Sequence, residues 1–147
     1  GLDNIWPALF EPVTKVEIMY GVSQEQLEKI DTVLTDELLS IGVHNVIVID
    51  TAGNTISQLD RGECSCDVAS FAALAAGNFA AVDAMAKLVG EEEFSLHFHR
   101  GESESIHFSR VNEDLLLITI FGNDVSLGFL RLKTVEVIDR IREIWSK

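Results

Sequence analysis

The stretch from Val68 to Gly90, VASFAALAAGNFAAVDAMAKLVG, constrains the fold of this chain more than any other. Its residue propensities predict a helix of about six turns. Asp67 is placed to cap its N-terminus and Gly90 to end it. An advance of about 100° per residue puts the larger apolar side chains on one side, which we expect to face a sheet. That side comprises Val68, Phe71, Leu74, Ala75, Phe79, Val82, Met85 and Val89.

The opposite side of this helix carries small residues where a soluble protein normally shows charge. It comprises Ala69, Ala73, Ala76, Gly77, Ala80 and Ala84, with Asp83 and Lys87 at its margin. One explanation is that alanine simply favours the helix. The other is that small side chains let a second backbone approach closely. We favour the second explanation and predict that a second copy, a partner or both cover this stripe.

The remaining pattern predicts a single α+β domain. Residues 1–18 read as an N-terminal arm and residues 19–147 as the domain. The alternation of Val16, Ile18 and Tyr20 with Lys15, Glu17 and Met19 allows a short strand. A capping box of Ser23 and Gln26 begins the first helix. The expected order is α-β-β-α-β-β-β-α, a five-stranded antiparallel sheet with helices on both faces. The strands are expected near 44–50, 55–60, 93–100, 105–111 and 114–122, and the last helix is capped by Asp124 or Ser126.

Charge and composition exclude several classes of partner. The formal net charge is −13, so the surface repels nucleic-acid phosphates and anionic membranes. The apolar tract over 68–82 is mostly alanine and is interrupted by Gly77 and Asn78, which we read as too weakly apolar for membrane insertion. No basic segment with an apolar core opens the chain, so we expect a cytoplasmic protein.

Several short motifs together resemble the roadblock/dynein light-chain family. They are the hairpin VIVIDTAGN, the helix AALAAGNFAAVDAMAKLVG with the GEEEF that follows, FHRG at 98–101 and SLGFLRL at 126–132. The resemblance covers roughly residues 19–145 and is strongest to the bacterial branch that acts on Ras-like GTPases of the MglA type in motility and polarity. It implies a homodimer whose long helices form a platform for one GTPase. It also implies that GTP hydrolysis is promoted without an arginine finger from the regulator.

Other residues suggest weaker hypotheses. Cys64 and Cys66 lie just before the long helix, where thiolates are stabilised. His97 and His99 share one strand face, and His107 lies on the next strand, so a histidine cluster depends on the strand register. An arginine finger is conceivable from Arg61, Arg100 or Arg110.

The sequence therefore predicts a regulator without an active site of its own. It has no phosphate-binding loop, and we expect no cofactor and no metal. The predicted interface is Ala69, Ala73, Ala76, Gly77, Ala80 and Ala84, in a homodimer that binds a Ras-like small GTPase. Two alternatives stay open: a thiol or metal sensor that uses Cys64, Cys66, His97 and His99, and a scaffold subunit that binds a protein without activating it.

Overall fold

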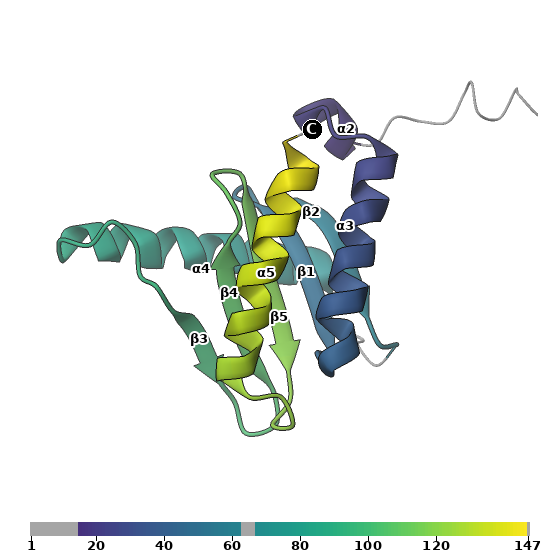
Figure 1. Ribbon diagram of the computed structural model, residues 1–147. Helices are drawn as coiled ribbons and strands as arrows, with labels where there is room; N and C mark the ends of the chain where they lie inside the picture. The colour runs from purple at the N-terminus through teal and green to yellow at the C-terminus, as the bar shows by residue number, and fades with distance from the viewer. Residues whose placement is uncertain (1–14, 63–66, 147) are drawn as a thin grey trace, which may run out of the picture.

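A five-stranded antiparallel sheet lies between helices in the computed structural model, which describes residues 15–62 and 67–146 (Figure 1). The strand order across the sheet is β2-β1-β5-β4-β3. The predicted α+β class and the order α-β-β-α-β-β-β-α are confirmed. The elements are α2 (Lys15–Tyr20), α3 (Gln24–Glu37), the 3-10 turn η1 (Leu39–Ile41), β1 (Asn45–Asp50), β2 (Thr55–Asp60), α4 (Val68–Leu88), β3 (His97–Arg100), β4 (Ser105–Arg110), β5 (Leu115–Phe121) and α5 (Leu127–Trp145).

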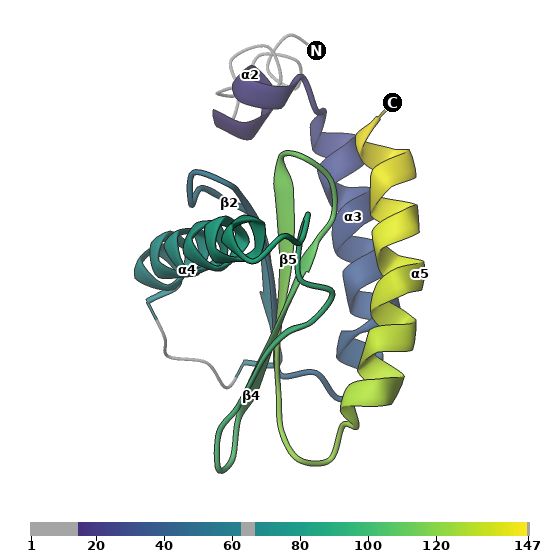
Figure 2. The ribbon, with the colours of Figure 1, turned by 90° about the vertical axis from the view of Figure 1, so that its left-hand side faces the viewer.

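The two faces of the sheet are covered by different helices (Figure 2). Helices α3 and α5 pack together on one face, and α4 lies alone on the other. Alternation along β1 divides its side chains between the two layers, with Val46 and Val48 facing α3 and α5, and Ile47 and Ile49 facing α4. Every residue of β1 is buried because both of its faces are covered.

Polar caps set the beginnings of the long helices, as the sequence predicts. The Ser23 hydroxyl accepts from the backbone N–H of Gln26, and the Gln26 side chain accepts from the N–H of Ser23, which completes the capping box. Asp67 caps α4 by accepting from the N–H of Ser70. Ser126, one of the two predicted candidates, caps α5.

The predicted short strand near residue 18 is wrong, because Lys15–Tyr20 form helix α2. An alternating pattern over six residues fits a single helical turn and a half almost as well as a strand. Gly21 ends the helix with a φ of +65°, a backbone conformation that glycine adopts without strain. Residues 1–14 lie outside the described part of the chain, so the rest of the arm stays a prediction.

Candidate functional site

Helix α4 packs on the sheet mainly through alanine. Its buried residues are Ala72, Ala75, Ala76, Phe79 and Ala86. The predicted burial of Leu74, Met85 and Val89 is wrong, since all three are exposed. Ala76, predicted on the open stripe, is instead only 7% exposed. The helix is therefore rotated from the predicted orientation, so that small side chains let its axis lie close to the sheet.

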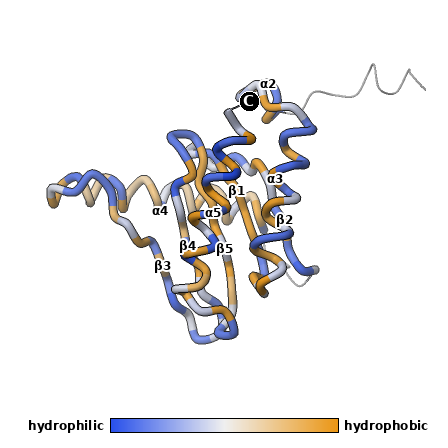
Figure 3. The backbone as a smooth tube through the Cα atoms, viewed as in Figure 1, coloured by the Kyte–Doolittle hydropathy of each residue, from blue (hydrophilic) through white to orange (hydrophobic). Residues whose placement is uncertain are grey.

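We call the exposed side of α4 its outer face. Five of the six predicted stripe residues lie on it: Ala69, Ala73, Gly77, Ala80 and Ala84. The sequence reasoning missed the larger members of this face, because it placed Leu74 and Met85 against the sheet. Leu74 is 74% exposed and Leu88 is 86% exposed, and Met85 is about half exposed. In Figure 3 much of the α4 tube is coloured as apolar, although only part of the helix is buried.

The turn between β1 and β2 touches α4 at this surface. A Cβ atom added at Gly53 would lie 3.1 Å from the Cα of Ala73 and 3.4 Å from the carbonyl oxygen of Ala72. Gly53 also has a φ of +92°. The turn and the helix thus approach backbone to backbone, which requires glycine on one side and a small residue on the other.

The shape of this turn is set by the buried carboxylate of Asp50. It accepts from the backbone N–H groups of Ala52 at 3.0 Å and Asn54 at 2.8 Å, and from the Asn54 side-chain amide at 2.8 Å. The Tyr20 hydroxyl of α2 donates a fourth bond, also at 2.8 Å. Burial raises the pKa of Asp50, but these hydrogen bonds outweigh it and leave the pKa below its usual range.

By length and composition, α4 also qualifies as a helix that crosses a membrane, contrary to the reading of its sequence as too weakly apolar. The same test is passed by helices of soluble folds. In this structure Phe79 and four alanines of α4 are buried in the protein. The apolar composition is thus partly explained by packing on the sheet, and the outer face is the part that packing leaves unexplained.

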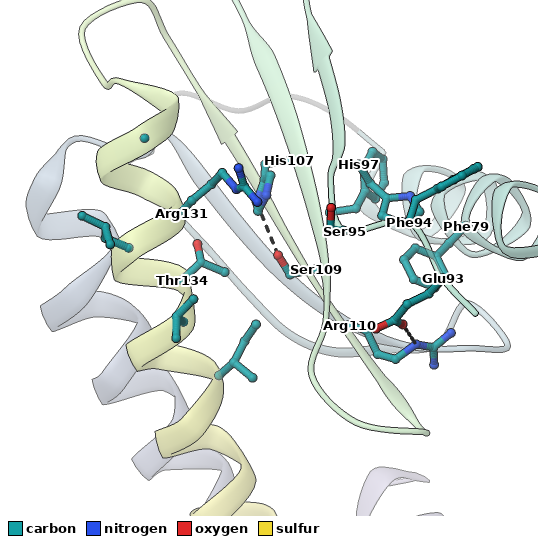
Figure 4. A pocket seen from close by; sticks show the side chains of 15 residues that line it. Phe79, Glu93, Phe94, Ser95, His97, His107, Ser109, Arg110, Arg131 and Thr134 are labelled. Carbon is teal, nitrogen blue, oxygen red and sulfur yellow. Dashed lines mark hydrogen bonds and ion pairs between the residues drawn. The ribbon is translucent and has the colours of Figure 1, made fainter. Parts of the chain in front are cut away.

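A second candidate site is a hollow of about 500 Å³ at the β3 edge of the sheet (Figure 4). It reaches from Phe79 and Phe94 on the α4 side to Arg131 and Thr134 of α5. His107 lines it and is 4% exposed. Burial lowers the pKa of His107 to about 4, with further contributions from charge interactions with Arg131 and His97. The imidazole is therefore neutral at physiological pH.

The polar groups of this hollow are poorly arranged for hydrolysis. The Ser109 hydroxyl lies 3.4 Å from Nδ1 of His107, a long distance for a nucleophile and its base. A histidine with a pKa near 4 is a weak base at neutral pH. The nearby carboxylate of Glu93 lies 3.6 Å from Arg110 rather than against the histidine. The hollow thus offers no assembled catalytic triad among the described residues.

The strand register separates the three histidines. His97 pairs with Phe108 and His99 with Ile106, whereas His107 pairs with Phe98. His97 and His99 therefore share the α4 face, where His97 packs 4.7 Å from the Phe79 ring and His99 packs edge-on against Phe108. The described residues contain no group of three His, Cys, Asp or Glu side chains that fits a metal ion. Cys64 and Cys66 lie outside the described residues.

None of the three arginines considered as fingers belongs to the outer face of α4, although Arg110 contacts this helix at Phe79 and Asp83. Arg61 donates to the carbonyl of Leu39 at 3.0 Å. Arg110 lies over the Phe79 ring, 4.9 Å from its centroid, and next to Asp83 and Glu93. The Arg100 guanidinium lies 5.3 Å from the centroid of the Phe98 ring. Helix α4 itself contains no arginine, so its outer face supplies none.

Comparisons with known proteins agree with this geometry. The family model described as Roadblock/LC7 domain matches residues 30–121. The structure of MglB from Myxococcus xanthus is 33% identical, with a TM-score of 0.77 over 85% of this chain and 93% of that chain. MglB from Thermus thermophilus is 26% identical, with a TM-score of 0.76 over 85% and 94%. A structure described as MglB with tetrameric arrangement is 25% identical, with a TM-score of 0.77 over 85% and 93%. No curated protein matches the chain.

Proposed function

Because this chain belongs to the Roadblock/LC7 family, we propose that it is a non-catalytic regulator of a small GTPase. In this proposal a cytoplasmic homodimer binds the GTP form of a Ras-like GTPase of the MglA type and promotes GTP hydrolysis. The observation that carries the proposal is the outer face of α4, where alanine and glycine lie beside exposed Leu74, Met85 and Leu88.

This face has the properties of a protein-binding surface. Each exposed leucine or methionine gains roughly 1.5–3 kcal/mol when it is fully buried, so a partner that covers the three of them gains substantially. The small residues between them let a partner helix or strand approach the α4 backbone closely. Apolar patches of this kind on a soluble fold mark interaction sites.

Self-association is the second part of the proposal. In a two-fold dimer the same surface meets itself, and two α4 helices placed side by side form one continuous platform. The likeness to an MglB described as tetrameric supports association between copies of this fold. The interface residues we propose are Ala69, Ala73, Gly77, Ala80 and Ala84, and Ala76 contributes by letting α4 lie close to the sheet.

The composition of α4 supports activation without a catalytic residue of the regulator. An arginine finger must reach the γ-phosphate and be held there rigidly. The outer face has no arginine, and the basic side chains at its margin, Lys87 and Arg110, both lie next to Asp83, at 3.4 and 3.9 Å. We therefore propose that docking orders the active site of the GTPase itself. The net charge of −13 suits a partner with a basic surface and favours rapid association.

A single-turnover hydrolysis assay tests the proposal. The MglA-type GTPase of the same organism, loaded with GTP, is mixed with a molar excess of this protein or of Ala80→Arg. We expect wild type to raise the hydrolysis rate by at least about tenfold, and Ala80→Arg to leave the intrinsic rate unchanged. Binding without acceleration would replace the activator by the scaffold function. A GTPase that neither binds nor is accelerated would overturn the proposal.

A further inference from the structure

Helix α4, which carries the outer face, packs on the sheet through few large side chains. Of the five buried residues of α4, four are alanines and only Phe79 is large, and one further large side chain, the half-buried Phe71, packs on this layer. Alanine buries little area and gains correspondingly little free energy. Contacts from other segments therefore matter more for the position of α4 than they would for a helix with a leucine-rich buried side.

The β1–β2 turn supplies such a contact at the N-terminal half of α4. Gly53 lies against the backbone of Ala72 and Ala73, and Ala73 is itself on the outer face. The backbone of this turn is fixed by the carboxylate of Asp50, which is fully buried. A shift of the Asp50 side chain would thus move the support on which this part of α4 rests.

Helix α2 holds this turn from outside the sheet. The Tyr20 hydroxyl donates to Asp50 at 2.8 Å, and Nζ of Lys15 donates to the Asn54 side-chain oxygen at 3.0 Å. The ring of Tyr20 also packs 5.2 Å from the ring of Trp145 at the end of α5. None of the six residues of α2 is buried, so contacts of this kind, rather than a core of its own, attach the helix. In Figure 2, α2 lies across the end of the sheet, next to the β1–β2 turn.

We infer that α2 is a strap and that Tyr20 and Asp50 are positioning residues for the GTPase-docking surface of α4. The contacts run from Tyr20 to Asp50, from the Asp50 turn to Gly53, and from Gly53 to Ala73. The docked strap keeps the turn against α4 and holds the outer face in its binding geometry. Release of the strap loosens the turn and weakens docking, although no residue of the strap contacts the partner.

The state of the Tyr20 hydroxyl supports this role for α2. The pKa of Tyr20 is raised to about 12 by burial and by the hydrogen bond to Asp50, which reflects a hydroxyl held in its neutral, donating form. This inference rests on the proposed function for its consequence in binding, but not for its structural part.

Tyr20→Phe tests the inference, because it removes the hydroxyl and keeps the ring against Trp145. Lys133→Met is the matched control, since it removes a polar contact of similar length, 3.0 Å from Nζ to Glu37, between α3 and α5. Amide hydrogen exchange of residues 51–54 and 68–79 is measured in full-length protein, together with the affinity for the GTP-loaded GTPase.

We expect Tyr20→Phe to speed exchange in both segments by about tenfold and to weaken GTPase binding by about fivefold, with neither effect in Lys133→Met. Unchanged exchange in Tyr20→Phe would overturn the strap, and so would equal acceleration in the control. Faster exchange with unchanged affinity would refute the positioning role. A wild-type protein that binds no GTPase would refute the proposed function, while the exchange comparison would still decide whether α2 holds the turn.

Discussion

Gly53→Ala tests the contact between the β1–β2 turn and α4, and Gly62→Ala is its matched control. Both glycines have positive φ, at +92° and +82°. Among the described residues, a Cβ at Gly62 would meet no atom within 4 Å, whereas a Cβ at Gly53 would lie 3.1 Å from the Cα of Ala73. The two variants therefore share the backbone strain and differ in the clash with α4.

The expected losses of unfolding free energy follow from the backbone strain and from the clash with α4. Positive φ costs a residue with a Cβ about 1–2 kcal/mol, and this is the whole loss expected for Gly62→Ala. Overpacking against a backbone that cannot rotate away costs about 1–3 kcal/mol more, so Gly53→Ala should lose roughly 2–5 kcal/mol. Urea unfolding measures both as shifts of the midpoint at constant slope. Equal losses in the two variants would refute the close approach of the turn to α4.

Three further predictions concern the titratable groups. Because the pKa of His107 is lowered from 6.5 to about 4, the unfolded chain binds this proton before the folded chain does, and the unfolding free energy falls by up to roughly 3 kcal/mol as the pH drops from 6.5 toward 4. His107→Phe should remove this dependence of the unfolding free energy on pH. An unchanged pH dependence would contradict the burial of a neutral imidazole. Because the pKa of Tyr20 is raised from 10.0 to about 12, its contribution to the unfolding free energy is complete below pH 10 and is lost as the pH rises through 12. Ultraviolet titration of this single tyrosine should give a midpoint near 12. A midpoint near 10 would show that the hydrogen bond to Asp50 is not made. Asp50→Asn should lower the unfolding free energy by about 1–3 kcal/mol, because an amide cannot accept all four hydrogen bonds, and a neutral result by urea unfolding would be inconsistent with the observed turn.

The sequence predicts the architecture correctly where the signals, such as helix caps and apolar periodicity, are local. Ser23, Asp67 and Ser126 cap helices because their side chains reach backbone groups within the next three residues. The run of apolar residues in β1 reflects burial on both faces, and the apolar periodicity of α3 reflects burial on one. These features depend on spacing alone, so they can be predicted without tertiary contacts.

The side of α4 that faces the sheet could not be predicted from spacing in the same way. Periodicity analysis assigns large apolar residues to the core, but here Leu74 and Met85 are exposed while Ala72 and Ala76 are buried. Alanine carries almost no periodic signal, because it is common on both sides of the helix. The close approach of the backbones at Gly53 and Ala73 favours small residues at both positions. This contact joins segments about 20 residues apart in the sequence, so local periodicity does not reveal it. The separation of His107 from His97 likewise depends on strand register.

The equilibrium affinity for the GTPase loaded with a non-hydrolysable GTP analogue tests the central claim most directly. Wild type is compared with Ala80→Arg on the outer face of α4 and with Thr35→Arg, which adds the same side chain at an exposed site on α3. The account predicts that Ala80→Arg binds at least about tenfold more weakly, and that Thr35→Arg binds and unfolds as wild type does. Wild-type affinity in Ala80→Arg, or an equal loss in Thr35→Arg, would contradict docking on α4.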